Sequence, residues 1–387
     1  MAYFYMKTKK LSLFPNSDYM RNLILVLFLF LGKLTLLAHD VTLRDSVTNA
    51  PIFCATVCDA DGNYVGRSDV NGNINLKKGC AYHVSHICYE SKKFICDDNT
   101  SVVMSPKSYT MPDLVVTAKM KKYYRCKVFF RNVQYVDSCM KYYVDGVREL
   151  FIDTKKRKVK SGNAVFRRFQ TMNNDIRQKK KRVVMMEIAP GLAWMERQSM
   201  YEKIMTDEIK RIDGDIVYGD SVPIGRCEVY PDKKEIVLSC DQLYPKPYKK
   251  WNLFGYHCLR TEDKCTEVYD ADGTVPPTIF DLKSSNRCRH ITFSLKKDFV
   301  WDYDCEDTFY VVEREYTDTM EPTSYEVMKQ DYDKYYAMYP ADEKTKSQLA
   351  EMKEVDYFKD FLFKRRDAKI QSLFFASLRL IINPLIS

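Results

Sequence analysis

From His39 to about Lys107, apolar and polar residues alternate in short runs that are separated by turn residues. Alternating runs of four to nine residues are typical of half-buried strands. Asp61-Gly62 and Asn71-Gly72 are the clearest turns, because glycine adopts without strain the positive φ of a tight hairpin. The pattern predicts a seven-stranded antiparallel β-sandwich over 39–107, with strands at 40–43, 52–58, 63–67, 73–76, 81–89, 92–95 and 101–104.

After a linker at 108–121, the chain from 122 to 340 is strand-rich and aromatic. Asp145-Gly146, in the middle of an apolar run, indicates a hairpin turn, and 195–211 has the apolar spacing of a helix. We expect a larger antiparallel sheet domain, which could curve into a half-barrel, with a helix against one face. Its predicted strands are 123–131, 140–152, 182–187, 226–230, 235–240, 265–269, 291–295, 299–303 and 309–314.

The segment 341–387 is predicted to be helical from 342 to 382, so the fold class is mainly β with C-terminal helices. Leu349, Met352, Val355, Phe358 and Leu362 recur every three or four residues and would form one apolar face against the sheet. The stretch 373–382 is apolar nearly all round, but it is shorter than the roughly 20 residues that cross a bilayer. It predicts a buried or partner-packed helix, and peripheral membrane contact is the alternative.

Nine apolar residues, 23–31, follow Arg21, and Leu36-Leu37-Ala38 ends in a small residue suited to cleavage. This arrangement predicts a secretory signal peptide over 1–38, with Met20 as an alternative start. An uncleaved amphipathic anchor is the other interpretation. Residues 1–38 are therefore left out of the predicted fold, and we expect an exported protein in the periplasm or associated with the outer membrane.

The predicted sandwich resembles the carboxypeptidase-regulatory-like domain, a transthyretin-type sandwich common in envelope proteins of Gram-negative bacteria. The resemblance depends on Asp45, Thr48, Pro51, Ile52, Ala55, Val57, Asp69, Gly72, Leu76, His86 and Tyr89. It implies a spacer or docking role without catalytic residues. Cys88 stands where family members usually have glycine. The following segment, 111–118, is similar to the one that joins this sandwich to the plug of TonB-dependent receptors, which makes an accessory subunit of an outer-membrane uptake system an alternative.

The formal charge is +9 overall and +5 once residues 1–38 are removed, which gives no argument for nucleic acid as a partner. Twelve cations and one acid, Asp175, lie between Thr154 and Arg182. This run could contact an anionic membrane surface or an acidic glycan, or it could form solvated hairpin arms. The candidate anion-binding residues are Lys155, Lys156, Arg157, Lys179, Lys180, Lys181 and Arg182.

Candidate catalytic chemistry is limited to one carboxylate pair. Asp302 and Asp304 are two apart on a predicted strand, so both would project from one face among aromatic residues, as in a hydrolase of glycan or peptide. Solvated acids are the alternative. His83 and His86 are three apart on a strand and would face opposite ways, which excludes them as joint ligands of one zinc ion. We predict no cofactor and no metal site.

The thirteen cysteines are an odd number and are spread thinly, which favours small core residues over a disulfide scaffold. Cys54 and Cys58 would be about 13 Å apart along one strand, too far for a bridge. A bridge among Cys80, Cys88 and Cys96 is the expected exception. Taken together, the sequence predicts a non-enzymatic envelope protein in which the sandwich carries a binding or structural domain, with an envelope protein or glycan as partner.

Overall fold

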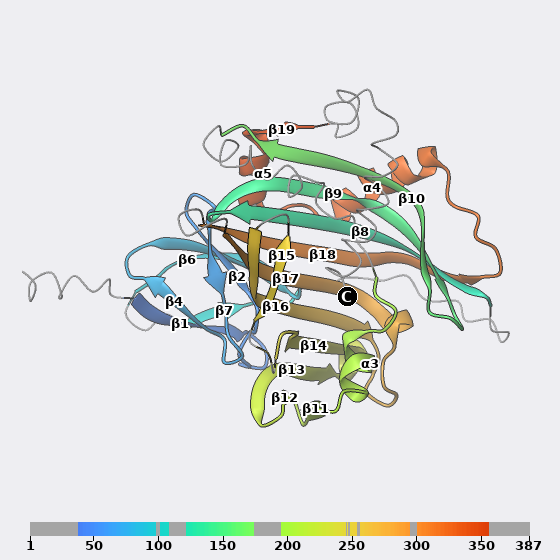
Figure 1. The fold of residues 1–387 in the computed structure, drawn as a ribbon, viewed down its shortest axis with the longest axis horizontal. Helices are drawn as coiled ribbons and strands as arrows, with labels where there is room; N and C mark the ends of the chain where they lie inside the picture. Colours follow the sequence, from blue (N-terminus) through green and yellow to red (C-terminus); the bar gives the residue numbers. More distant parts are fainter. Residues whose placement is uncertain are drawn as a thin grey trace, which may run out of the picture.

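The computed structural model describes residues 38–97, 101–107, 121–173, 195–244, 246, 248–253, 256–294 and 300–355. These residues form a mainly β structure of three sheets with a few helices (Figure 1). The fold class therefore agrees with the sequence. Several predictions concern residues outside these ranges: most of the leader 1–38, the linker 108–121, the strand 182–187, the cations at 179–182 and the apolar stretch 373–382.

The first two sheets are the sandwich. One has the order β4-β1-β7 and the other the order β3-β2-β5-β6. Its core consists almost wholly of apolar side chains, and Val41, Leu43 and Val57 are completely buried there. The pairing is antiparallel except between β1 and β7, which run parallel. The strands are β1 (Ala38–Asp45), β2 (Thr56–Asp59), β3 (Tyr64–Arg67), β4 (Asn73–Lys77), β5 (Ala81–His86), β6 (Tyr89–Ile95) and β7 (Ser101–Met104).

The seven strands match the predicted ones apart from two boundaries. Gly62 and Gly72 have φ values of +83° and +76°, so both glycine turns form as expected. The predicted strand 81–89 is wrong, because the chain turns at Ile87-Cys88 and continues as β6. The hairpin thus forms without the glycine that is usual in the resembling family. The predicted strand 52–58 begins only at Thr56, since Cys54 has a φ of +62° and interrupts it.

The third sheet has twelve strands in the order β11-β12-β13-β14-β16-β17-β18-β8-β9-β10-β19, with β15 added beside β16. Every pair in it is antiparallel. Its strands are β8 (Tyr123–Val136), β9 (Cys139–Asp153), β10 (Val159–Thr171), β11 (Lys210–Asp213), β12 (Ile216–Gly219), β13 (Val222–Tyr230), β14 (Glu235–Asp241), β15 (Lys249–Leu253), β16 (Tyr256–Asp270), β17 (Leu282–Ser294), β18 (Val300–Thr317) and β19 (Met352–Glu354).

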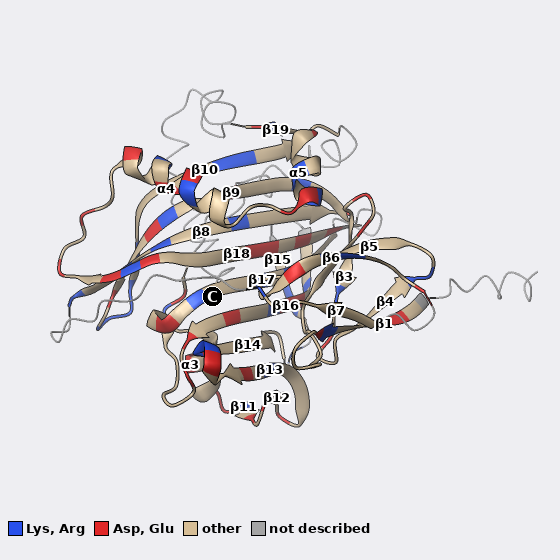
Figure 2. Cartoon of the chain, turned by 180° about the vertical axis from the view of Figure 1, so that it is seen from behind, with Lys and Arg blue, Asp and Glu red and all other residues tan. Residues whose placement is uncertain are grey.

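The large sheet is curved, and its two faces have different partners (Figures 1 and 2). On the inner face, side chains of β8 and β9 such as Tyr124 and Leu150 share one core with Leu238 of β14 and with helix α3 (Met200–Met205). On the outer face, Phe129 and Tyr310 pack against helix α4 (Tyr325–Met338) and against the sandwich. The sandwich and α4 therefore cover the same face.

The predicted turn at Asp145-Gly146 is wrong, because both residues lie inside the continuous strand β9. The turn is at Asp137-Ser138, where both residues have positive φ. Asp145 is completely buried and accepts hydrogen bonds from Arg167 and, at 2.9 Å, from the Tyr332 hydroxyl of α4. A buried carboxylate that anchors a helix cannot be distinguished from a turn aspartate by the dipeptide alone.

The helices are shorter than predicted. The helical spacing at 195–211 yields only α3, whose start is fixed by a capping box between Ser199 and Glu202. The continuous helix predicted for 342–382 is also wrong, since helix α5 (Glu343–Ala350) ends and β19 pairs with β10. Met352 still packs beside Leu349 on the sheet, which explains the misleading apolar spacing. No helix among the described residues is long and apolar enough to cross a membrane.

Candidate functional site

The outer face of the large sheet offers the sandwich a row of polar side chains. Strand register places Arg226, Ser239, Thr266, Asn286 and Thr308 directly opposite one another across β13, β14, β16, β17 and β18. Such a face cannot be buried against an apolar layer without losing hydrogen bonds to water. The sandwich therefore meets it with polar groups at one end of the contact and encloses a cavity at the other.

At one end of the contact, which we call the charged end, ionised groups of the sandwich and of the large sheet pair directly. Arg67 of β3 has a completely buried side chain, and its Nη1 lies 2.9 Å from Glu262 and 3.8 Å from Asp304. Asp304 is 2.9 Å from His290 Nδ1, and this hydrogen bond raises the pKa of His290. Thr56 of β2 donates to Glu306 at 3.0 Å. The charged end is thus a docking contact in which opposite charges of the sandwich and the large sheet pair.

At the other end, a pocket of about 70 Å³ lies between the sandwich and the large sheet. This volume is several times the roughly 10–15 Å³ that holds a single water molecule. Its walls combine aromatic rings, among them Phe53, Tyr230 and Tyr310, with charged side chains from both parts. A concave site with an apolar body and a few polar groups is the usual form of a small-molecule site.

His86, the last residue of β5, contributes a polar atom without a partner to this pocket. Its Nδ1 accepts a hydrogen bond of 3.1 Å from the Cys88 backbone N–H, so in the neutral ring Nε2 carries the hydrogen. Nε2 is buried and has no hydrogen-bond partner of normal geometry among the described residues, although the Phe53 backbone interacts with the ring and opposes the fall in its pKa. Burial, with the nearby charge of Lys107, lowers the pKa of His86 to about 3. His86 therefore presents an N–H donor that remains neutral at ordinary pH.

Lys107, just after β7, contributes a cation to the pocket lining. Its backbone N–H donates to the Cys88 carbonyl, and its half-buried side chain feels the charges of Glu90 and Arg131. Burial lowers the pKa of Lys107 because the charged form is partly desolvated. An anionic group in the pocket would offset this cost.

The carboxylates that line the pocket are already occupied. Asp45 accepts the Tyr89 hydroxyl at 2.8 Å and two backbone N–H groups. Glu235 is 2.6 Å from Lys283, and Glu228 is 3.3 Å from Arg226. The polar groups left to meet a ligand are therefore donors.

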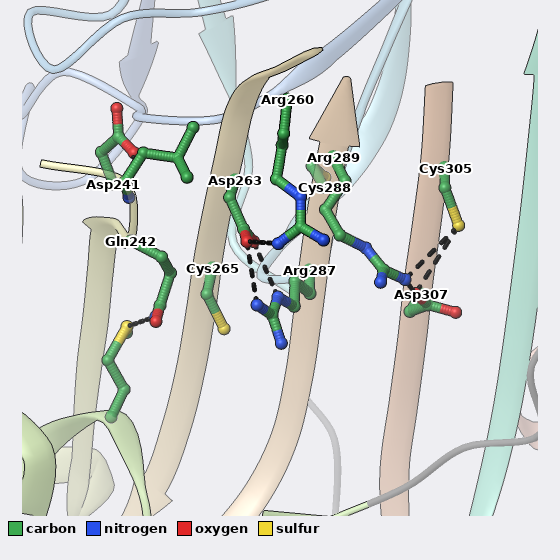
Figure 3. A network of polar contacts seen from close by, with 12 residues as sticks. Asp241, Gln242, Arg260, Asp263, Cys265, Arg287, Cys288, Arg289, Cys305 and Asp307 are labelled. Carbon is green, nitrogen blue, oxygen red and sulfur yellow. Dashed lines mark hydrogen bonds and ion pairs between the residues drawn. The ribbon is translucent and has the colours of Figure 1, made fainter. Parts of the chain in front are cut away.

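The inner face of the same sheet, opposite the sandwich, has a charge network of its own. Asp263 receives Arg287 at 2.7 and 2.9 Å and Arg260 at 2.8 Å, and Arg289 pairs with Asp307 (Figure 3). The Arg287–Asp263 pair is bidentate, a geometry that gives strong charge-assisted hydrogen bonds. We therefore interpret this network as one that stabilises the sheet.

The candidate catalytic pair lies at the charged end and outside the pocket. Asp302 and Asp304 do project to the same side, since His290 is 3.6 Å from Asp302 and 2.9 Å from Asp304. The Asp304 side chain is only 3% exposed and faces Arg67, whereas that of Asp302 is 52% exposed and accepts the Thr292 hydroxyl. The two acids thus hold one histidine between them.

The described part of the basic run is partly engaged within the fold. Lys155 and Lys156 are exposed in the turn between β9 and β10, where Asp153 accepts their backbone N–H groups. Arg157 lies over the Phe280 ring at 4.2 Å and 3.5 Å from Glu202. Lys179, Lys180, Lys181 and Arg182 lie outside the described residues.

The structure describes all thirteen cysteines, and all are thiols. The bridge expected among Cys80, Cys88 and Cys96 is therefore not formed. Cys88 lines the pocket, and burial raises its pKa to about 12.

Sequence reasoning missed the pocket residues His86 and Lys107. In the sequence, His86 stands out only through the resemblance and as half of an unsuitable zinc pair. The one usable signal was the polar alternation Arg226-x-Glu228-x-Tyr230, which marks a polar strand face.

Comparison with known proteins adds little. No family model matches the chain, and no curated protein matches it. Among solved structures, one of lipovitellin, described as showing lipid–protein interactions, aligns with 53% of this chain at 6% identity and a TM-score of 0.22. The alignment spans 26% of the lipovitellin chain. A likeness this small carries no argument about fold or function.

Proposed function

We propose that this protein is a non-enzymatic ligand-binding protein of the cell envelope. In this proposal the sandwich docks on the outer face of its own large sheet, and the pocket between them takes a small anionic ligand with an aromatic or apolar body. The carrying observation is the cavity that places His86 Nε2, a buried donor without a described partner, together with the half-buried cation Lys107. Export and envelope location follow from the leader sequence and remain part of the proposal.

Three features support binding over hydrolysis. Buried polar groups normally have partners, so the unpartnered His86 donor beside the Lys107 cation favours a ligand that accepts hydrogen bonds and carries negative charge. The pocket carboxylates are held by Tyr89, Arg226 and Lys283, which leaves them poorly placed for acid–base work. The rings of Phe53, Tyr230 and Tyr310 supply surface for an apolar body.

Calorimetric titration of the full chain with benzoate, and with neutral benzamide as the isosteric control, tests the proposal. We expect benzoate to bind and benzamide to bind at least tenfold more weakly, because only the anion pairs with Lys107. Lys107→Met should weaken benzoate binding about tenfold, while the exposed residue Lys93 gives a matched control, Lys93→Met, with unchanged affinity. Benzoate binding that is absent, or that is equal in wild type and Lys107→Met, would contradict the proposal.

A further inference from the structure

Two cysteines from different parts of the fold meet at the contact between the sandwich and the large sheet. Cys54 lies just before β2, and Cys288 lies in the middle of β17. Together with Phe53 they form one buried cluster, and the neighbouring Cys54 side chain contributes to the raised pKa of Cys288. The two residues are 2% and 0% exposed. The strand face that carries Cys288 also carries Asn286, whose Oδ1 accepts the Cys288 thiol at 3.0 Å.

The backbone holds Cys54 at this contact in a conformation that a cysteine rarely adopts. Its φ is +62°, in the left-handed region that favours glycine. The Cys54 N–H donates to the Ser68 carbonyl at 3.1 Å, and the Ala55 N–H donates to Ser68 Oγ at 2.9 Å. Strain of this kind persists only where the surroundings determine it, and it often marks a functional position.

A buried cation lies beside the two thiols. Arg67 pairs through Nη1 with Glu262, while its Nε and Nη2 are buried without a hydrogen-bond partner among the described residues. Burial raises the pKa of Cys288, and the charge of Arg67 opposes this rise. The net result is a pKa well above that of an ordinary thiol, so Cys288 stays protonated while the contact is closed and becomes reactive only when water reaches it.

We propose that Cys54 and Cys288 form a redox-dependent disulfide that joins the sandwich covalently to the large sheet. With oxidised glutathione as oxidant, one thiolate attacks the glutathione disulfide and releases one reduced glutathione. The second thiolate then attacks the mixed disulfide and releases another. The protein loses two protons and two electrons, and one glutathione disulfide becomes two thiols. Because both sulfurs are buried in the folded chain, the bond forms during folding or a transient opening of the contact.

The link has two consequences. It closes a loop of roughly 230 residues, and long loops give the largest loss of unfolded-state entropy in the chain-entropy account of disulfides. It also fixes Phe53, the neighbour of Cys54 in the chain, in the wall of the pocket. The disulfide would form whether or not the pocket holds a ligand.

The test is to refold the full chain from urea in oxidised or in reduced glutathione and to digest it with trypsin without reduction. The predicted product joins peptide 45–67 to the dipeptide 288–289. Peptide 45–67 also contains Cys58, so the digestion is repeated in a Cys58→Ser background. We expect the same linked product there. Its absence after oxidative refolding, or a link that requires Cys58, would overturn the proposal.

Thermal unfolding provides the second measurement. Oxidation should raise the Tm by about 5 °C, a shift within the range expected for a cross-link of this kind. Cys54→Gly should remove the redox-dependent shift in Tm. Glycine adopts the positive φ of position 54 without strain, so we expect the variant to keep the fold. The matched control is Cys240→Ser. Cys240 faces Cys265 across β14 and β16, so a bridge between these two residues would lie within one sheet and would not join it to the sandwich. A shift that survives Cys54→Gly, or disappears in Cys240→Ser, would contradict the assignment.

Discussion

The two ends of the contact between the sandwich and the large sheet treat charged groups differently. At the charged end, carboxylates of the large sheet pair with Arg67 and His290, although Nε and Nη2 of Arg67 stay without a described partner. At the pocket end, His86 Nε2 is buried without a described partner and the half-buried Lys107 lines the same cavity. Pairing produces docking, and its absence in a cavity produces a site that a ligand can complete. The difference therefore separates the structural from the functional part of a single interface.

The largest effect is expected at the charged end. Glu262→Ala leaves the buried guanidinium of Arg67 without its nearest carboxylate and should lower the free energy of unfolding by about 3 kcal/mol. Urea unfolding monitored by circular dichroism measures it. Arg67→Met combined with Glu262→Leu should lose much less, because no charge remains buried alone. Equal losses in the single and double variants would show that the pair does not carry the contact.

The second effect is a pH dependence from the pocket end. Burial lowers the pKa of His86 to about 3, whereas the unfolded ring titrates near 6.5. Below pH 6.5 His86 is therefore protonated in the unfolded chain but stays neutral in the folded chain. The free energy of unfolding should fall by about 1.4 kcal/mol per pH unit between pH 6 and pH 4. His86→Phe should flatten the profile of unfolding free energy over that interval, and an unchanged slope would place the effect elsewhere.

A smaller effect of opposite sign is expected from His290. Its hydrogen bond to Asp304 raises its pKa, so its stabilising contribution is present below pH 6.5 and is lost as the pH rises through the folded pKa. Asp304→Asn should remove about 1 kcal/mol of stability at pH 6 and less at pH 8. The imidazole NMR titration of His290 measures the pKa directly. A midpoint at or below 6.5 would contradict this sign.

The smallest effect is that of Lys107→Met on stability without ligand. Removing a partly desolvated ammonium should leave the free energy of unfolding unchanged or raise it by up to about 1 kcal/mol. Thermal unfolding in benzoate-free buffer measures it. A loss above 1 kcal/mol would mean that Lys107 is engaged as Arg67 is, and the contrast between the two ends would disappear.

The sequence predicts best what depends on neighbouring residues. The sandwich strands and the turns at Gly62 and Gly72 follow from alternation and from glycine conformation. Asp145-Gly146 gives a wrong turn prediction because the glycine is required here by close strand packing. A Cβ on Gly146 would lie 2.5 Å from the Val165 carbonyl oxygen of β10. The sequence shows a small residue but not the strand beside it.

The candidate site is harder to predict because its residues come from distant parts of the chain. His86 and Lys107 belong to the sandwich, while Glu228, Lys283 and Tyr310 belong to three strands of the large sheet. Each residue alone is typical of a solvated surface. Only the docking of one part on the other removes their water, and alternation within a strand contains no information about that docking. Asp302 and Asp304 were correctly placed on one side, but their shared partner His290 could not be foreseen.

The three-residue strand β19 has a consequence for how the chain behaves when shortened. It pairs with Phe169, Gln170 and Thr171 at the margin of the twelve-stranded sheet and supplies Lys353 and Glu354 there. Charged residues on a marginal strand discourage further chains from adding to a sheet. A truncation after Ala350 would uncover backbone donors and acceptors next to Phe169, and such a fragment would be prone to self-association through strand addition.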